Sequence, residues 1–347
     1  SLDAEQDKTG NVLIRVPPTE GLEEAATVVI QGHMDMVCEK TPESSHNFET
    51  DPIPVVVDGE WLRAEDTTLG ADNGIAIALA FALVESDTPH PALEILVTVD
   101  EESGLTGAQS VEPGWLRGTQ LLNVDSEDEG VFTVGCAGGR DTIFTLTVDQ
   151  EPFSEGLEVR ELVVSGLQGG HSGVDIHHGR ANANQLLVRT LLALDAVRLA
   201  TIRGGNAHNA IPRDAIAVVG FKAADETKVS AAVDRALETF RAEYGTLEPG
   251  LHVGLRSASP PANLIARSST QRLLDLLAAM PHGVIRMSSD VPGLVETSMN
   301  FATIRMRNDA VEVKTSQRSS YRSRLDELVH RLEAIARLAG ATTKNES

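Results

Sequence analysis

The sequence predicts an α/β protein with two domains: a first domain around a mostly parallel central sheet, and a second domain built as an α+β sandwich. Three observations lead to this prediction. The chain has 347 residues, which suits two domains of ordinary size. Up to about residue 125, continuous apolar segments alternate with a helical segment, a pattern typical of parallel strands buried on both faces. Further along the chain, apolar and polar residues alternate as they do in antiparallel strands.

The first domain is expected to combine β-branched strands with one long helix. The segment 73–85 follows turn residues and continues with mostly apolar side chains, which predicts a helix. We expect this domain to span residues 1–138. Its strands are predicted at NVLIRV (11–16), within ATVVIQGHMDMV (26–37), and at PALEILVTVD (91–100) and QLLNVD (120–125).

The second domain is expected to span residues 139–341 and to follow a glycine-rich hinge at 135–141. The last residues, 342–347, are expected to start a return to the first domain. Alternating patterns predict strands at 141–149, 158–167 and 214–223, with one or two more within 295–320. Helical periodicity predicts helices at about 183–199, 228–245, 269–280 and 323–340.

The composition argues against several classes of partner. Hydrophobic residues make up 41% of the chain and aromatic residues only 3%, so the core is expected to be aliphatic. A formal charge of −22 without a basic cluster argues against nucleic acids and anionic membranes as partners. Two cysteines, Cys38 and Cys136, are too few for a disulfide framework. With no long apolar run and no signal-peptide pattern, we expect a cytoplasmic protein.

Acidic side chains and one histidine follow the ends of the expected strands in the first domain. The strand 91–100 stops at three adjacent carboxylates, which repel each other unless a cation compensates them. Because the carboxyl ends of parallel strands meet at one edge of a sheet, four segments are expected to bring their side chains together there. Histidine and carboxylate groups suit zinc, manganese or cobalt, and a bridging carboxylate makes a two-metal site. The candidate residues are His33, Asp35, Asp72, Glu101, Glu102 and Asp125.

Each of these signals also has an ordinary structural explanation. A lone H-x-D pattern, as at His33, often has no metal; Asp72 before Asn-Gly suits a turn or a helix cap, and Asp125 suits a solvated acidic loop. The adjacent Glu101 and Glu102 are harder to explain in this way, because a pair of carboxylates after a buried strand needs a cationic partner. The ordinary explanations together require four coincidences in order along the chain. The sequence therefore favours a metal site.

Several longer motifs resemble those of one metallopeptidase family. In chain order they are QGHMDMV (31–37), TTLGADNGIA (67–76), EESGLTGA (101–108), LLNVDSEDEGVFTVGCAGG (121–139), GGHSGVDIHHGRANAN (169–184), NAIPRDA (209–215) and VPGLVETSMN (291–300). They are similar to motifs of the aminoacyl-histidine dipeptidases, also called cytosolic non-specific dipeptidases, in the family of co-catalytic zinc aminoacylases and carboxypeptidases. The resemblance runs from about residue 10 to residue 340. It implies a zinc-peptidase-like catalytic domain followed by a lid or dimerisation domain.

The resemblance also implies a set of metal ligands. His33 and Asp125 would bind one metal ion and Glu102 the other, while Asp72 would bridge the two. The family has a cis peptide bond after the bridging residue, which corresponds to the bond between Asp72 and Asn73. The two ions would be zinc, with manganese or cobalt as alternatives.

The remaining roles follow from the same resemblance. Asp35 would orient His33. Glu101 would be the general base that takes a proton from the attacking water and passes it to the leaving amine of a dipeptide, with Xaa-His dipeptides among the substrates. His171, in the second domain, would donate to the developing oxyanion, in related enzymes often across a homodimer made by the lid. Asn209 would help to bind the substrate.

Other polar residues in these motifs are expected to have ordinary roles. His177 and His178 are expected to make local hydrogen bonds near the start of a helix, and His208 is expected to be a loop residue. Asp100 is not expected to be a metal ligand.

The sequence departs from the family in one respect. In related enzymes the catalytic domain resumes after the lid and supplies a last histidine ligand, and a helix precedes the first strand; neither pattern is found here. We therefore expect a fragment that binds one metal ion more tightly than the second and turns over slowly. Two alternatives remain open: a deacylase of N-acyl amino acids from the same family, and a catalytically impaired fragment that only binds metal and dimerises.

Overall fold

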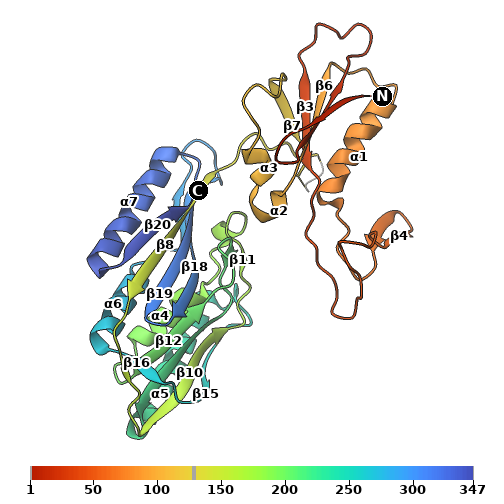
Figure 1. Cartoon of the computed structure of the whole chain (residues 1–347). Helices are drawn as coiled ribbons and strands as arrows, with labels where there is room; N and C mark the ends of the chain where they lie inside the picture. Colours follow the sequence, from red (N-terminus) through yellow and green to blue (C-terminus); the bar gives the residue numbers. More distant parts are fainter. Residues whose placement is uncertain (1, 127–129, 347) are drawn as a thin grey trace. The chain divides into compact units, whose positions relative to one another are not determined.

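The structure, a computed structural model, describes residues 2–126 and 130–346. It consists of two compact units, Ser1–Thr133 and Val134–Ser347, which are described separately (Figure 1). Residues 127–129 of the expected acidic loop, and residue 347 of the expected return segment, lie outside the described residues.

The first unit is built on a five-stranded sheet with the order β1-β2-β6-β3-β7. Strand β3 is parallel to β6 and β7, while β1 and β2 are antiparallel to their neighbours. The parallel arrangement that the sequence predicts is therefore confined to three strands. The carboxylate of Asp7 accepts hydrogen bonds from the backbone N–H groups of residues 9–11 and turns β1 back onto β2. The strands are β1 (Asp3–Gln6), β2 (Val12–Val16), β3 (Val28–His33), β6 (Leu93–Thr98) and β7 (Gln120–Asn123).

Apolar side chains cover both faces of the central strands, as the sequence predicts. Every residue of β6 is buried. On one face, Ile95 packs with Ala80 of helix α1 (Ala71–Glu85), and on the other, Leu96 packs near Trp115. This burial supplies the hydrophobic stabilisation of the unit. It also fixes the ends of β3 and β6, where the candidate residues lie. Smaller elements are the hairpin β4 (Val55–Asp58) and β5 (Trp61–Ala64), and the short helices α2 (Glu101–Gly104) and α3 (Thr106–Gln109).

The second unit is a two-layer sandwich, as predicted, of helices packed on a nine-stranded antiparallel sheet (Figure 1). The sheet order is β15-β10-β14-β12-β18-β19-β8-β20, and β17 pairs with β18. The strands are β8 (Gly138–Thr147), β10 (Leu157–Ser165), β12 (Arg198–Gly204), β14 (Ala215–Lys222), β15 (His252–Ser257), β17 (Gly283–Met287), β18 (Val295–Arg307), β19 (Ala310–Ser319) and β20 (Thr342–Glu346). The helices are α4 (Ala183–Leu192), α5 (Glu226–Tyr244), α6 (Arg267–Ala278) and α7 (Arg322–Ala339).

The order of the large sheet is symmetric about its centre. One half follows the chain as β10-α4-β12-β14-α5-β15, and the other as β8-α6-β18-β19-α7-β20. Both halves have the same succession of strands and helices, and their inner strands β12 and β18 pair with each other. The second half is interrupted in the sequence, because all elements of the first half lie between β8 and α6.

Two expectations about the second unit need correction. Helix α4 ends at Leu192, whereas the sequence predicts a helix to residue 199; Leu199 and Ile202 instead bury their side chains in β12. Pairing of β12 with β14 overrides the helical pattern of this segment. The predicted hinge 135–141 is also shorter, because β8 begins at Gly138 and pairs with β19 from that residue on.

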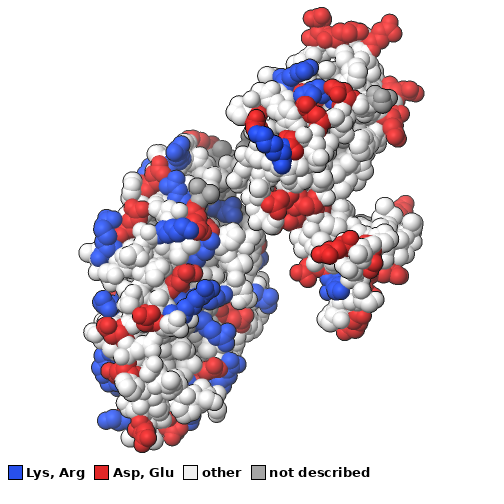
Figure 2. All heavy atoms as spheres, viewed as in Figure 1, with Lys and Arg blue, Asp and Glu red and all other residues white. Residues whose placement is uncertain are grey.

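The formal charge of the chain belongs entirely to the first unit. Residues 1–133 contain 27 of the 51 acidic and 5 of the 29 basic side chains, which gives −22, whereas residues 134–347 contain 24 of each. On the face shown in Figure 2, Lys and Arg are few over the first unit and interspersed with acidic residues over the second.

Candidate metal centre

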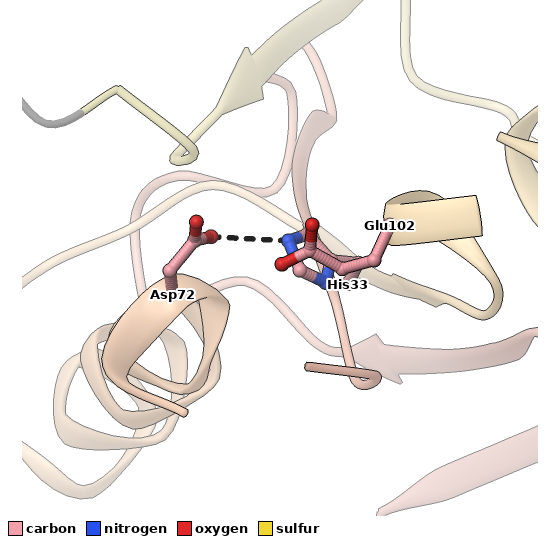
Figure 3. A group of neighbouring side chains, drawn as sticks. All are labelled: His33, Asp72 and Glu102. Carbon is pink, nitrogen blue, oxygen red and sulfur yellow. Dashed lines mark hydrogen bonds and ion pairs between the residues drawn. The ribbon is translucent and has the colours of Figure 1, made fainter. Parts of the chain in front are cut away.

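Side chains from three elements of the first unit converge at the carboxyl end of the parallel strands. His33 ends β3, Asp72 lies in the first turn of α1 and Glu102 lies in α2 (Figure 3). Their possible ligand atoms all lie within 4.8 Å of one another. His33 is 1% exposed, whereas both carboxylates are exposed to solvent. The buried imidazole and exposed carboxylates form a site that is open on one side.

The hydrogen-bond partners of His33 show what this site can bind. Its Nδ1 lies 2.8 Å from the carbonyl oxygen of Asp35, which can only accept, so Nδ1 carries a hydrogen. In the neutral ring, Nε2 is then an acceptor, yet it lies 3.1 Å from Oδ1 of Asp72 and 3.5 Å from Oδ1 of Asp125. Either a second proton on the ring or a metal ion must therefore lie between Nε2 and these oxygens. A ring nitrogen with several carboxylate oxygens is a donor set that fits a divalent metal ion such as zinc or manganese.

Asp35 does more than the sequence suggests. Oδ1 lies 3.5 Å from Nδ1 of His33, which fits the predicted orienting contact. Its two carboxylate oxygens also accept the backbone N–H groups of Glu101 and Glu102, each at 3.1 Å. Burial opposes ionisation of Asp35, but these two amides outweigh it and lower the pKa of the carboxyl group. Asp35 therefore anchors the turn that presents both glutamates.

Charge crowding shifts the pKa values of the other groups. Burial raises the pKa of Glu101 and of Asp125, and neighbouring carboxylates add to the shift in both cases. Burial acts against protonation of His33, but Asp125, the Asp35 carbonyl and Asp72 together outweigh it and raise its pKa. Among the described residues, no lysine or arginine forms an ion pair with these carboxylates. The centre thus has a deficit of positive charge that a metal ion would correct.

Asn73 holds segments of the centre together, a role that the sequence analysis did not indicate. Its side chain is 3% exposed; Nδ2 donates to the carbonyl oxygen of Val124 at 2.8 Å, and Oδ1 accepts the backbone N–H of His33 at 3.2 Å. It therefore ties the start of α1 to the segments that carry His33 and Asp125. The peptide bond between Asp72 and Asn73 is cis, as the family resemblance implied. The dipeptide Asn-Gly reads as an ordinary turn signal, which hid this role.

The predicted residues of the second unit also lie together. His171 ends the short strand β11 (Gly170–His171), which pairs with β13 (Ala210–Ile211), and the backbone N–H of Ser172 donates to the carbonyl oxygen of Asn209 at 2.7 Å. Although His171 is exposed, partial loss of hydration at its ring, and then the nearby Arg318 guanidinium, lower its pKa. A Cβ atom at Gly173 would lie 3.0 Å from Cε1 of His171 and 3.2 Å from Cζ of Arg318. Arg318, on β19, is a second residue that no sequence signal indicated.

Three polar residues of these motifs, His177, His178 and Asp100, have partners close in the sequence. His177 and His178 lie in a 3-10 turn, with their ring centroids 4.0 Å apart, and Nδ1 of His178 lies 3.3 Å from Asp175. The side chain of Asp100 accepts a hydrogen bond from the hydroxyl of Ser103. These residues make local contacts.

Comparisons with known proteins place the chain in a family. Residues 163–248 match the peptidase dimerisation domain. The chain is 42% identical over 346 residues to the cytosol non-specific dipeptidase of Escherichia coli (strain K12), which covers 98% of this chain and 71% of that protein. A crystal structure of aminoacylhistidine dipeptidase from Vibrio alginolyticus superimposes with a TM-score of 0.84 at 41% identity, over 100% of this chain and 71% of that one.

The fold and this set of side chains together define a hydrolase of the metallopeptidase class. The identity with the E. coli enzyme extends over nearly the whole chain and decides the family within that class. The chain belongs to the cytosol non-specific dipeptidases. The family assignment from the sequence motifs is thereby confirmed. No helix among the described residues is both long enough and apolar enough to cross a membrane.

Proposed function

We propose that this chain hydrolyses dipeptides in the cytoplasm with two divalent metal ions, most simply zinc, held at the candidate metal centre. The observation that carries the proposal is the position of Nε2 of His33, a buried acceptor that faces the carboxylates of Asp72 and Asp125. In this assignment His33 and Asp125 would hold one ion, Glu102 would hold the other and Asp72 would contribute to both. The similarity to a non-specific dipeptidase and to an aminoacylhistidine dipeptidase supports a dipeptide substrate, with aminoacyl-histidine dipeptides among the candidates.

The residues of the centre then have defined tasks. The ions supply Lewis acidity and lower the pKa of bound water. Glu101, whose Oε2 lies 3.9 Å from Nε2 of His33, takes a proton from the attacking water and transfers it to the nitrogen of the leaving amine. Its raised pKa makes Glu101 a stronger base for the first step, while the protonated carboxyl group stays acidic enough to protonate the leaving amine in the second. Asp35 holds the backbone of Glu101 in place.

The Glu101→Gln variant tests this assignment. Glutamine has the same shape but cannot take up the proton, so we expect hydrolysis of a dipeptide panel to fall by at least about a hundredfold, with metal binding unchanged. Zn²⁺, Mn²⁺ and Co²⁺ are each supplied, and release of free amino acids is measured. Asp100→Asn is the matched control, since Asp100 precedes Glu101 and bonds only locally. Full activity in Glu101→Gln would refute the proposed base.

The same assay, extended with N-acetyl amino acids, separates the alternatives. N-acetyl amino acids cleaved faster than every dipeptide would favour the deacylase. A protein that binds metal but cleaves neither class would favour the metal-binding, catalytically impaired alternative.

The two metal sites are expected to differ in affinity. Among the residues that the structure describes, His33 contributes the one histidine ring of the metal centre. In this assignment, only one of the two ions therefore gains a nitrogen ligand. Calorimetric titration of the metal-free chain with Zn²⁺ is expected to show one tight step and one step weaker by at least about tenfold. Two equally tight steps would contradict the ligand assignment.

His171 and Asn209 are proposed to act on the substrate from the second unit. His171 would donate to the oxyanion, and Asn209 would bind the substrate. Removal of an oxyanion donor costs about 10²–10³ in kcat, and we expect His171→Ala to show a loss in this range. Metal affinity is expected to stay unchanged, because the metal centre belongs to the other unit.

A homodimer through the second unit is also proposed, because a peptidase dimerisation domain covers residues 163–248. This match lies in the half of the sheet whose inner strand β12 already pairs with β18 of the same chain. The dimer must therefore use another surface.

Two experiments test the dimer. Light scattering is expected to give twice the chain mass of 37.0 kDa. If His171 serves the partner's metal centre, mixing Glu101→Gln and His171→Ala chains restores activity; mixtures that stay inactive would show that it serves its own chain.

A further inference from the structure

Glu248 is a buried carboxylate with no task in the proposed chemistry. It follows α5, is 2% exposed, and makes no ion pair with a cationic side chain in the part of the chain that the structure describes. Burying a carboxylate without a cation is costly unless other groups satisfy its oxygens. Its two oxygens accept backbone amides instead: Oε2 from Gln168 at 2.7 Å and Oε1 from Ala181 at 3.0 Å.

These two amides lie at the two ends of one segment. Residues 168–181, which we call the His171 loop, leave the sheet after β10 and return just before α4. One side chain thus binds the loop where it starts and where it ends. Charge-assisted bonds of this kind are stronger than bonds between neutral groups, so Glu248 holds both ends of the loop against the second unit.

A short chain of contacts leads from this clamp to His171. Arg180, next to Ala181, donates to the carbonyl oxygen of Gly169 at 2.6 Å and lies 3.2 Å from the carboxylate of Asp175. The other oxygen of Asp175 accepts the backbone N–H of His171 at 2.8 Å. Gly169 and Gly170 have φ values of 67° and 136°, so the backbone between the clamp and His171 has a conformation that other residues rarely adopt.

We propose that Glu248 is a positioning residue for His171, acting through the two ends of the His171 loop. The proposal rests on the proposed role of His171 in hydrolysis only for its catalytic consequence; the effect on the loop can be measured by itself. Glutamine cannot replace Glu248, because its single acceptor oxygen satisfies one of the two amides and its NH₂ group faces the other N–H.

Two measurements on the full chain test the proposal in Glu248→Gln. Hydrogen exchange of the backbone amides in 168–181 is expected to become about tenfold faster than in the unchanged protein. kcat for a dipeptide is expected to fall by about tenfold with KM changed less than twofold, because a displaced donor weakens only the transition-state contact. Glu243→Gln is the matched control, since Glu243 lies on α5 but pairs with Arg189, an exposed residue outside the His171 loop.

A double-mutant cycle shows whether the effect passes through His171. If it does, Glu248→Gln causes no further loss of kcat in a His171→Ala background. The same tenfold loss in both backgrounds, or unchanged exchange in the loop, would overturn the proposal. If His171→Ala itself leaves kcat unchanged, the proposed role of His171 is wrong, and accelerated exchange in Glu248→Gln alone then decides whether Glu248 holds the loop.

A second variant guards against a failure to fold. Glu248→Asp keeps both acceptor oxygens and the charge on a side chain shorter by one methylene, so it is expected to give intermediate values of exchange and kcat. Suppose that Glu248→Gln does not fold, and that folded Glu248→Asp has the exchange rates and the kcat of the unchanged protein. This result would overturn the positioning role and leave only a role in folding.

Discussion

At the scale of single residues, Asp35 connects the two kinds of ligand in the metal centre. It fixes the hydrogen of His33 on Nδ1 through its carbonyl group and binds the amides of Glu101 and Glu102 through its carboxylate. Asp35→Asn leaves one acceptor oxygen for two amides, so the turn with the glutamates loses one of its contacts. We expect the affinity for Zn²⁺ in calorimetric titration to fall by about 10–100-fold. Asp58→Asn, at an exposed hairpin position paired with Arg63, is the control; equal affinities in both variants would contradict this role.

The close contact between Gly32 on β3 and helix α1 leads to a second prediction at this scale. A Cβ atom at this position would lie 2.3 Å from Oδ1 of Asn73 and 2.6 Å from Cβ of Ala76, so any side chain pushes α1 away from β3. We expect Gly32→Ala to lower the free energy of unfolding by about 1–3 kcal/mol and to weaken metal binding as Asn73 moves. Gly74 is a matched control in the same helix: a Cβ there meets nothing within 4 Å.

The paired substitutions separate crowding from helix propensity. Gly74→Ala is expected to leave stability unchanged or to raise it by up to about 1 kcal/mol. Thermal unfolding followed by circular dichroism measures both variants. A Gly32→Ala protein as stable as Gly74→Ala would show that β3 and α1 are not in close contact.

At the scale of secondary-structure elements, His282 joins helix α4 to strand β18. Its Nδ1 faces the side-chain N–H of Asn182, the N-cap of α4, at 3.2 Å, and the backbone N–H of Phe301 at 3.4 Å. Both partners donate, so the ring must remain neutral at Nδ1. Burial lowers the pKa of His282 to about 4.

This depressed pKa makes the stability of the second unit depend on pH. An unfolded histidine titrates near pH 6.5. As the pH falls from about 6.5 to about 4, the unfolded chain takes up a proton that the folded chain does not, and folding stability is lost by about 3 kcal/mol over this interval. His282→Gln is expected to remove this part of the pH dependence in denaturant titrations at pH 7 and pH 4. The exposed His330, changed to Gln, is the control; identical pH dependence in both variants would contradict the argument.

The same scale shows which structural features the sequence could predict. The continuous apolar runs indicated β3, β6 and β7. The strands β3 and β6 are largely buried on both faces and need no alternation, whereas every residue of the edge strand β7 is exposed. The predicted end of helix α4 was wrong, because strand pairing at Leu199 overrides the local helix propensity. His33, Asp72 and Glu102 could be predicted as neighbours, since parallel strands end at one edge. Arg318 could not be, because only the non-local pairing of the large sheet brings it to His171.

At the scale of the whole molecule, the two units differ sharply in charge. All of the formal charge of −22 lies in residues 1–133, which also carry the metal centre, while residues 134–347 have equal numbers of acidic and basic side chains. Two divalent ions would offset only a small part of this charge. A field of this size extends about 30 Å from the surface at 0.01 M salt and about 8 Å at 0.15 M. The unit that carries the metal centre therefore attracts cations and repels anions at low ionic strength.

This asymmetry predicts how substrate charge affects hydrolysis. For a dipeptide with a net positive charge, kcat/KM is expected to fall several-fold between about 0.01 M and 0.15 M salt, because screening removes the attraction. For a dipeptide with a net negative charge, it is expected to rise over the same range. Ala-Ala, a zwitterion with no net charge, serves as the control, and its kcat/KM is expected to change little. Initial rates at substrate concentrations well below KM give the three values directly. If the three substrates respond to salt in the same way, the charge of the first unit does not act on substrate encounter, and preference among dipeptides is decided by contacts within the site.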